Sequence, residues 1–595
     1  MGYKAPVEDI LFALDTAAVL DELIERGIYD GLDVDTVRAI VEEAGKFGSD
    51  VLDPINHSGD LAGSRLEDGQ VITPDGWQDA YNQFCESGWN ALPGPEEFGG
   101  QGLPEAVSVA VTEIWNAANM SFSLCPLLSQ GATAALLAQG SEELKNRYLP
   151  KMISGEWPGT MNLTEPHAGS DLGHLRARAE KQDDGTYKIF GTKIYITYGD
   201  HDLTENIVHL VLARATDAPA GTRGISLFLV PKFLVNDDGS LGERNDVITA
   251  GVEHKLGIHA SPTCTLKYGE NGGATGYLVG EENRGLNAMF IMMNAARLAV
   301  GMQGVGIADR ATQRAIEYAN ERTQGRGPGA KNGEMSPIIE HADIRRTIMT
   351  MKSLVQASRS ICLVTARESD LMHRGETEEI RAAAGALSAL LTPVAKAFST
   401  DIGVEVASMG VQIHGGMGFM EETGAAQYYR DARILPIYEG TNGIQAIDLV
   451  TRKLPLGNGE VVRQYIAELK ETADEVRASN RPEFGLMGQR LDEAVTALSE
   501  ASEYMVGQLQ SNPEAALTGA AQYLRLFGLT AGGTYLARGA LKAVRDGSVA
   551  NGKAANVKAA RFFAEHLLVA APGHGQSVVT GADALADVTP ELLSA

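Results

Sequence analysis

The chain of 595 residues lacks the features that mark several large classes of protein. It has only four cysteines, which are widely spaced and form no CxxC pair. Such spacing disfavours a disulfide framework and a zinc site, so four reduced thiols are expected. The thiols are Cys85, Cys125, Cys264 and Cys362.

Positive charge is also scarce, since 50 lysines and arginines face 77 aspartates and glutamates and leave a formal net charge of -27. An acidic surface repels phosphates, which disfavours a nucleic-acid partner. The N-terminal residues 1–6 show no basic segment followed by an apolar one, and we expect no apolar run to be long enough for a membrane span. The sequence therefore predicts a cytoplasmic protein.

The order of the elements predicts a multidomain α+β protein. Apolar residues recur at helical spacing up to about residue 157, with helical runs at 105–118 and 132–137. Short runs rich in aromatic and β-branched residues follow, and long helical runs begin at Gly285. No GxGxxG motif follows a strand, so a Rossmann site is not supported. The predicted domains are an N-terminal helical domain 1–158, a middle antiparallel β-barrel or sandwich domain 159–283, a helical bundle domain 284–454 and an additional C-terminal helical domain 455–595.

Three short segments could bind a ligand, and each also has a purely structural explanation. The loop 164–171 supplies glycine and serine donors, but it could be a capped turn. The strand end 193–197 places an aromatic ring near a hydroxyl, as a planar cofactor requires, or it could be ordinary core. The glycines of 412–419 allow a close backbone approach. His414 within that segment has no second ligand at metal spacing, so no metal site is predicted.

The most informative segment is 431–442, which contains Glu439. Its neighbours Ile437 and Tyr438 should partly desolvate the carboxylate and raise its pKa towards that of a useful base. Alternatively, Glu439 is an acid at a helix start, where the helix dipole stabilises its charge. The local chemistry leaves both explanations open.

Taken together, these segments resemble the acyl-CoA dehydrogenase family over about residues 75–450. The matching motifs occur in the expected order: Thr164-Glu165-Pro166-x-Ala168-Gly169-Ser170-Asp171, Lys255 to Thr263, Arg297, Tyr318 with Arg322 and Gln324, Gln412 to Gly416, and Tyr438-Glu439-Gly440-Thr441. The resemblance implies that fold: a helical domain, a β domain and a four-helix domain. FAD is expected between the last two domains and also to reach a neighbouring subunit.

The resemblance also implies roles for single residues. Glu439 is the expected catalytic base. The expected FAD contacts are Asn162, Leu163, Thr164, Gly169, Ser170, Tyr195, Ile196, Thr197, Arg322, Gln324, Gln412, His414, Gly415, Gly416 and Thr441, with Gln412 to Gly416 supplied by the partner subunit. The expected substrate contacts are Ser170, Asn294, Arg297 and Gly440. The chain departs from the family pattern at Tyr195, where tryptophan is frequent, at Asn294, where an acid is frequent, and at Gly443, where a polar residue is frequent.

The implied reaction is the α,β-dehydrogenation of an acyl-CoA. Glu439 removes the α proton, a hydride moves from the β carbon to flavin N5, and the product is a trans-2-enoyl-CoA. The backbone N–H of Glu439 and a ribityl hydroxyl of FAD stabilise the enolate-like charge on the thioester carbonyl. An electron-transferring flavoprotein is the expected electron acceptor.

The tail after residue 454, the segment 3–6 and the run 439–446 resemble a long bacterial subgroup of the family. That likeness implies oxidation of 3-(methylthio)propanoyl-CoA (3-methylmercaptopropionyl-CoA) to 3-(methylthio)acryloyl-CoA in dimethylsulfoniopropionate degradation. It also implies a homodimer, because the tail helices would occupy the place of a second dimer. A short- or medium-chain fatty acyl-CoA dehydrogenase is the alternative. Two other classes stay open: an oxygenating or nitroalkane-oxidising flavoprotein, which Glu439 disfavours, and a non-catalytic acyl-CoA-binding protein.

Overall fold

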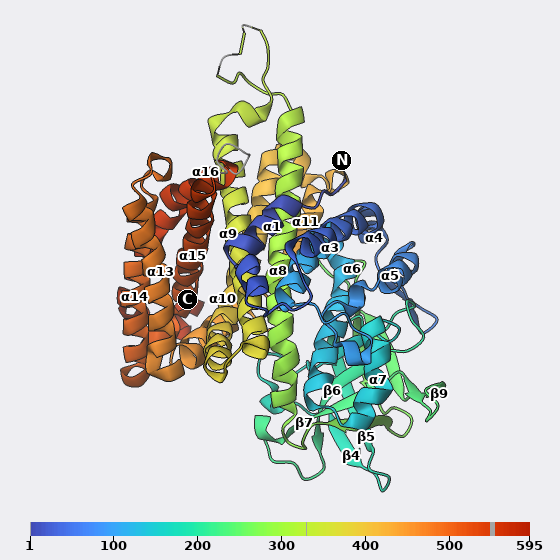
Figure 1. Ribbon diagram of the computed structural model, residues 1–595. Coiled ribbons are helices and arrows are strands. Elements are labelled where there is room, and N and C mark those ends of the chain that lie inside the picture. The colour runs from blue at the N-terminus through green and yellow to red at the C-terminus, as the bar shows by residue number, and fades with distance from the viewer. Residues whose placement is uncertain (1, 329, 332, 548–553) are drawn as a thin grey trace.

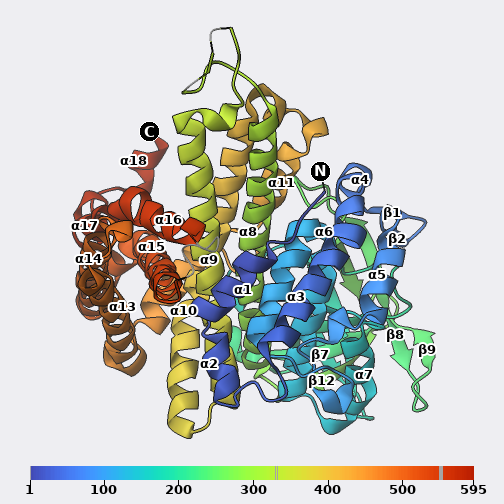
Figure 2. The same cartoon turned by 45° about the horizontal axis from the view of Figure 1, so that its top comes forward.

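The computed structural model describes residues 2–328, 330, 331, 333–547 and 554–595. Three long helices form the middle of the molecule: α8 (Gly285–Glu321), α9 (Ala342–Arg374) and α10 (Glu378–His414). The N-terminal helices and the main sheet lie on one side of them, and the C-terminal helices lie on the other (Figure 1). A view from above shows the same arrangement (Figure 2). The predicted α+β class is confirmed.

The N-terminal part is helical, as predicted, and adds one small hairpin. Its elements are α1 (Val7–Thr16), α2 (Leu20–Glu25), α3 (Val34–Phe47), α4 (Asp53–Ala62), β1 (Arg65–Glu67), β2 (Gln70–Ile72), α5 (Trp77–Glu86), α6 (Glu105–Gln139) and α7 (Glu142–Ser154). The two helical runs predicted at 105–118 and 132–137 are joined in α6. That helix kinks at Asn119, which has φ -157° and ψ 91°. The Asn119 side chain then accepts the N–H of Phe122 at 3.1 Å, which restarts the helix.

The middle part is a strongly bent sheet. Its strands are β3 (Gly159–Asn162), β4 (Arg178–Lys181), β5 (Tyr187–Thr197), β6 (Val208–Ala215), β7 (Ile225–Pro231), β10 (Val247–Val252), β11 (Thr263–Tyr268) and β12 (Ala274–Val279), with the small hairpin β8 (Phe233–Val235) and β9 (Leu241–Arg244) beside them. The order is β10-β11-β5-β12-β7-β6-β3, and β4 closes a ring by pairing with β5 and β6. The predicted barrel is therefore present. Two of its pairings, β3 with β6 and β4 with β6, are parallel rather than antiparallel.

The third part adds two short helices to α8, α9 and α10, namely α11 (Ala425–Ala432) and α12 (Asn442–Asp448). Gly285, at the start of α8, lies directly against the backbone of Ser226 and Leu227 in β7. Helix α9 runs antiparallel to α8, and α10 runs antiparallel to α9 and therefore parallel to α8. This arrangement places the end of α8 and the end of α10 at the same pole of the molecule, far from the sheet (Figure 1).

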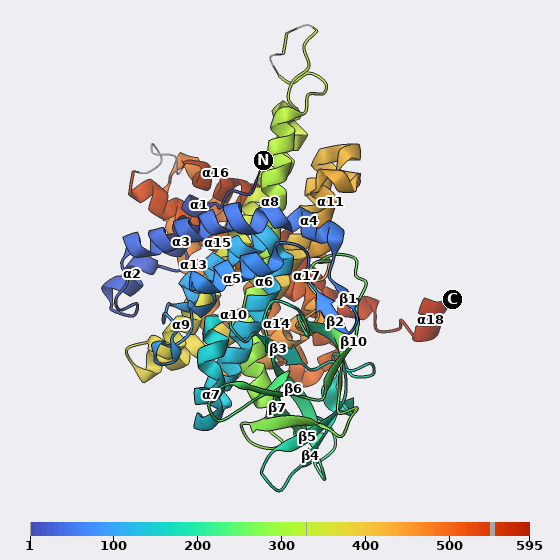
Figure 3. The same ribbon diagram turned by 90° about the vertical axis from the view of Figure 1, so that its right-hand side faces the viewer.

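The C-terminal part is a helical domain, as predicted. It comprises α13 (Glu460–Ser479), α14 (Met487–Ser511), α15 (Pro513–Arg545), α16 (Ala554–Phe562), α17 (Ala571–Thr580) and α18 (Pro590–Ser594). The amphipathic helix α13 was missed by the sequence analysis. Helix α15 packs on α9, α10 and α12, whereas α18 extends away from the molecule (Figure 3). The domain boundaries proposed from the sequence stay predictions.

The sequence-based expectation that no apolar run is long enough to span a bilayer is wrong when helices are judged by length and composition alone. Helices α6 and α8 and the stretch Glu378–Phe419 are each long and apolar enough. In the structure, however, 83%, 67% and 61% of their apolar windows are buried inside the protein. A helix that is surrounded by other helices is apolar on all sides, which explains these runs.

Candidate active site

Glu439 lies in the loop 433–441 between α11 and α12, which we call the base loop. Its backbone is left-handed, with φ 57°, and Gly440 follows with φ 82°. A non-glycine residue in this region is uncommon and persists only where its surroundings hold it. A Cβ on Gly440 would lie 2.8 Å from Nε2 of Gln445, so the turn requires glycine. The chain therefore fixes the direction of the Glu439 side chain.

Side chains from α8, α10 and α12 hold the base loop in place. The Gln445 amide donates to the carbonyl oxygens of Glu439 and Gly440, both at 3.2 Å. The Tyr438 hydroxyl is bonded to Gln303 of α8. The Lys396 ammonium of α10 donates to three oxygens of the same segment, as described further below. The sequence analysis identified the loop but none of these supports.

The carboxyl of Glu439 is half-buried, and its desolvation raises its pKa to about 7 despite the opposing charges of Arg297 and Lys396. Among the described residues, no hydrogen bond joins this carboxyl to an N–H of α12. Thr441 caps that helix instead, because its hydroxyl accepts the N–H of Ile444 at 3.2 Å. The geometry thus favours the base over the helix-start acid.

Arg297 lies beside the base loop and is 5% exposed. Its Nη1 is 3.5 Å from Oδ2 of Asp448 and 3.4 Å from Oδ1 of Asn294. Burial lowers the pKa of the Arg297 guanidinium below its usual value, and Asp448 opposes this shift. Asn294 is exposed and can be reached by a substrate, whereas the Arg297 side chain is buried, so the predicted substrate contact of Arg297 stays a prediction.

The predicted flavin-facing residues gather at the end of β5. A β-bulge interrupts the pairing of β5 with β11, and it turns Tyr195 outward at φ 61° with 60% exposure. The loop 164–171 is joined to β5 by the bond from Ile194 N–H to the Thr164 carbonyl, 3.0 Å long. A Cβ at the exposed Gly169 would meet only open space. The chain therefore leaves room for a flat ligand here.

Buried groups behind this surface were missed by the sequence analysis. Lys193 is fully buried, and its Nζ lies 2.9 Å from Oε1 of Glu165 and 3.0 Å from the Leu163 carbonyl. Glu165 also accepts the N–H groups of Arg176 and Ala177 at 2.7 and 3.0 Å. Burial lowers the pKa of Lys193 to about 8. This ion pair fixes the loop 164–171 against the sheet.

Two predicted FAD contacts can use only their backbone. The Asn162 side chain is buried and donates to Thr160 Oγ1 at 2.9 Å, while its Oδ1 accepts from the Tyr268 hydroxyl at 2.9 Å. The side chain of Ile196 is 2% exposed and belongs to the core of the β domain. By contrast, the hydroxyls of Thr164, Ser170 and Thr197 have no hydrogen-bond partner within the described part of the chain.

The remaining predicted FAD contacts form a separate group at the far pole of the molecule. His414 stacks on Tyr318 with ring centroids 4.4 Å apart. Arg322 and Gln324 directly follow α8, and Gln412, Gly415 and Gly416 are exposed beside them. Arg322, the C-cap of α8, lies 25 positions after Arg297, which at 1.5 Å per residue is about 37 Å. Within one protomer this group, which we call the distal patch, does not approach Glu439.

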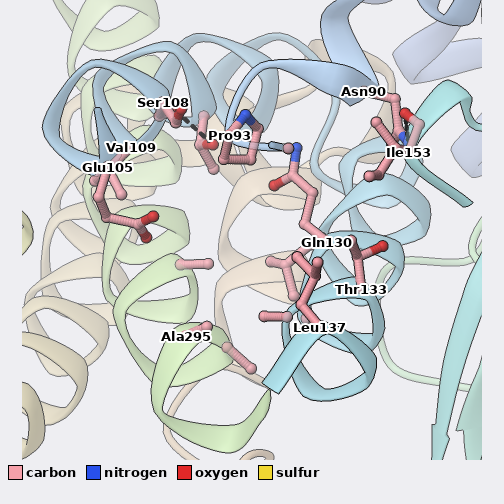
Figure 4. Close-up of a pocket in the computed structure, with 17 residues that line it drawn as sticks. Asn90, Pro93, Glu105, Ser108, Val109, Gln130, Thr133, Leu137, Ile153 and Ala295 are labelled. Atoms are coloured by element: carbon pink, nitrogen blue, oxygen red, sulfur yellow. Dashed lines mark hydrogen bonds between the residues drawn. The ribbon is translucent and has the colours of Figure 1, made fainter. Parts of the chain in front are cut away.

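A cavity of 170 Å³ lies between α6 and α8, and no residue of the base loop lines it (Figure 4). Ala295 and Ala299 of α8 face it, and Arg297 points away from that face because successive helical residues turn by about 100°. The carboxyl of Glu105 points towards its interior (Figure 4), and burial raises the pKa of Glu105 to about 7. The cavity is thus a feature apart from the base loop.

Glu439 thus provides a partly buried carboxyl with a raised pKa, and the end of β5 provides an open surface lined by hydroxyls. Domain profiles of one family match the chain: acyl-CoA dehydrogenase N-terminal domain at 35–156, middle domain at 160–270 and C-terminal domain at 283–454. A further profile, acetyl-CoA dehydrogenase C-terminal like, matches 465–589. The chain belongs to the acyl-CoA dehydrogenase family. It is an enzyme, an FAD-dependent oxidoreductase, as the sequence predicted.

The chain is 46% identical over 588 residues to 3-methylmercaptopropionyl-CoA dehydrogenase of Ruegeria pomeroyi, which covers 98% of this chain and 99% of that one. It is 36% identical to a butyryl-CoA dehydrogenase of Syntrophomonas wolfei over 86% and 85% of the two chains. Among solved structures, an acyl-CoA dehydrogenase complexed with FAD from Bacillus anthracis has the same fold. Its TM-score is 0.75 at 23% identity, with 95% and 91% of the chains covered.

Proposed function

We propose that this enzyme oxidises 3-(methylthio)propanoyl-CoA to 3-(methylthio)acryloyl-CoA, as a step of dimethylsulfoniopropionate degradation. The observation that supports this substrate is the 46% identity to the Ruegeria pomeroyi enzyme, which extends over nearly the full length of both chains, tail included. The three domains common to the family end near residue 454, so the similarity of the tail beyond that residue is an additional likeness to this relative.

In the proposed mechanism Glu439 removes the proton from the α carbon. A carboxylate is the active form, and a pKa near 7 gives a stronger base than an ordinary glutamate while leaving much of it ionised at neutral pH. The backbone N–H of Glu439 has no acceptor among the described residues. It is therefore available to the thioester carbonyl, where it would stabilise the charge that develops as the proton leaves.

The residues at the end of β5 suit an isoalloxazine ring. Tyr195 offers an aromatic face, and Thr164, Ser170 and Thr197 offer hydroxyls without partners, as described above. These residues would hold the flavin ring of FAD, which would supply the acceptor for the hydride that leaves the β carbon. The chain's own part is to hold the acyl group between this surface and Glu439, and to exclude water from the base loop.

We also propose a homodimer in which the distal patch completes the cofactor site of the other subunit. The separation of about 37 Å along α8 supports this arrangement, because one protomer cannot present both groups to one ligand. The sequence analysis expected only Gln412 to Gly416 from the partner. Because His414 stacks on Tyr318, which lies four residues before Arg322, we extend the proposal to Arg322 and Gln324.

An electron-transferring flavoprotein remains the proposed electron acceptor, and the cytoplasm remains the proposed location. Neither proposal rests on a particular contact in the structure. Both follow from the family resemblance and from the composition of the chain.

A substrate panel tests the proposed function. The purified holoenzyme is assayed with 3-(methylthio)propanoyl-, butanoyl- and octanoyl-CoA and an artificial electron acceptor. The proposal predicts the highest kcat/KM for the methylthio substrate. Butanoyl-CoA is the second candidate, because the Syntrophomonas relative is a butyryl-CoA dehydrogenase. A clear preference for butanoyl-CoA would replace the first assignment with the second, and a preference for octanoyl-CoA would overturn both.

A further inference from the structure

Lys396 is a fully buried lysine in the apolar helix α10. Burying an ammonium group is costly unless its donors are satisfied. Its Nζ donates to the Leu435 carbonyl at 2.9 Å, the Gly440 carbonyl at 3.0 Å and Oδ1 of Asn442 at 2.8 Å. All three donors of the ammonium are therefore used on one short segment.

The acceptors of Lys396 bracket Glu439 along the chain. Leu435 precedes Glu439 by four residues, and Gly440 follows it directly. The third acceptor, Asn442, is itself anchored, because its Nδ2 donates to the Ala397 carbonyl at 3.1 Å and to Oδ1 of Asp401 at 2.7 Å. Lys396 thus ties both ends of the base loop to α10.

No carboxylate accepts a hydrogen bond from Lys396 within the described part of the chain. This distinguishes it from Lys193, which is also fully buried but pairs directly with Glu165. The positive charge of Lys396 is consequently not neutralised by a contact partner, and it acts on the nearest ionisable groups around it.

We propose that Lys396 is a positioning residue for the base: its ammonium fixes the backbone on both sides of Glu439 and its charge favours the carboxylate form of that residue. This inference rests on the proposed function of Glu439 and deepens it. Lys396 is not a proton donor or acceptor in the reaction, since all three of its donors are held by Leu435, Gly440 and Asn442.

The charges around Lys396 set the sign of the expected effect. Burial lowers the pKa of Lys396 to about 7, the charges of Glu439 and Asp401 oppose this, and Arg297 of α8 reinforces it. Lys396 in turn lowers the pKa of Glu439. Removing the charge must therefore raise the pKa of Glu439, so that a higher pH is needed to form the active carboxylate.

Three variants of the FAD-loaded enzyme test this proposal. Lys396→Gln keeps an N–H donor group without the charge, Lys396→Met keeps neither, and Lys396→Arg keeps both. The rate of flavin reduction by saturating acyl-CoA is measured against pH. For Lys396→Gln we expect kcat to fall about 100-fold because the base is misplaced, with KM nearly unchanged. The acid limb of the pH–rate profile, where the rate rises with pH, should move to higher pH in Lys396→Gln. In Lys396→Arg the acid limb should stay where it is in the wild type.

Lys193→Met is the matched control, since it removes a lysine of equal burial away from the base loop. Its FAD content should be lower, because Lys193 holds the loop 164–171, but the acid limb of the loaded fraction should not move. An unshifted acid limb in FAD-loaded Lys396→Gln would overturn the proposal. Failure of Lys396→Gln to fold or to bind FAD would also overturn it, because Lys396 would then be a general structural residue. A wild-type enzyme that no acyl-CoA reduces would instead refute the proposed function.

Discussion

At the scale of single residues, the account depends on the protonation state of Glu439. Its pKa is raised to about 7, so the fraction of carboxylate changes most near neutral pH. Because the base works in the carboxylate form, the rate of α-proton removal should rise with pH through about 7 and level off above it. Single-turnover flavin reduction measured between about pH 5.5 and pH 8.5 checks this. A rate that is flat across this range would assign the proton transfer to another group.

The same carboxyl should make the stability of the enzyme depend on pH. Glutamate has a usual pKa of 4.5, and the folded state raises it to about 7. A raised carboxyl pKa means that the folded state binds the proton more tightly than the unfolded state, so the destabilisation caused by Glu439 grows as pH rises from 4.5 to about 7. Glu439→Gln should therefore raise the Tm above that of the wild type at pH 8, and the difference should shrink towards pH 5. A Tm difference between Glu439→Gln and the wild type that grows towards low pH would contradict the raised pKa of Glu439.

At the scale of elements, the loop 164–171 is tied to β5 by the buried pair of Glu165 and Lys193. Lys193→Met leaves the Glu165 carboxylate buried without its cation, which should lower the free energy of unfolding by about 3–5 kcal/mol and weaken FAD binding. The double variant Glu165→Gln with Lys193→Met removes both charges and should recover much of that loss. Denaturant unfolding and flavin absorbance measure the two effects. A double variant no more stable than the single one would show that the pair is not the source of the loss.

The tail helix α15 supports α10 directly behind the base loop. A Cβ on Gly528 of α15 would overlap the ring of Phe398, two residues beyond Lys396, and Arg525 lies over the same ring at 5.3 Å while it pairs with Glu405 at 2.9 Å. Gly528→Ala should therefore cost about 1–3 kcal/mol of stability by overpacking and should lower kcat by displacing α10. Gly507→Ala in α14 is the control, because its Cβ would meet no neighbour. Equal effects of the two substitutions, read from Tm and kcat, would remove the tail from this role.

The elements differ in how far the sequence predicts them. The helices α8, α9 and α10 were predictable because their apolar residues recur at helical spacing without interruption. The base loop was predictable because Tyr438 to Thr441 resembles a known motif. The supports at Lys193 and Lys396 were not, because their partners lie 28 to 46 residues away and include backbone oxygens, which leave no trace in the sequence. A single lysine in an apolar run was the one available signal.

At the scale of the whole molecule, we propose that the cofactor site needs two copies of the chain. A mixed dimer of Glu439→Gln and Arg322→Ala tests this. One of its two sites combines an intact base with an intact distal patch, and the other carries both defects. Each mixed dimer formed on coexpression should therefore have about half of the wild-type activity, by the symmetry of a two-fold dimer. Restoration should be absent when the two substitutions are placed in the same chain. Failure of the mixed dimer to regain activity would return Arg322 to the subunit that carries the base.

The central claim, that Glu439 is the base of an acyl-CoA dehydrogenase, is tested most directly by anaerobic flavin bleaching. The wild type, Glu439→Gln and Glu105→Gln are each loaded with FAD and mixed with 3-(methylthio)propanoyl-CoA at about pH 8. Glu105 is a suitable control because burial also raises its pKa to about 7, but it lies outside the base loop. We predict rapid bleaching of the wild type and of Glu105→Gln. For Glu439→Gln at unchanged FAD content we predict that the bleaching rate falls by about 10³-fold or more. Bleaching of Glu439→Gln at the wild-type rate would contradict the account.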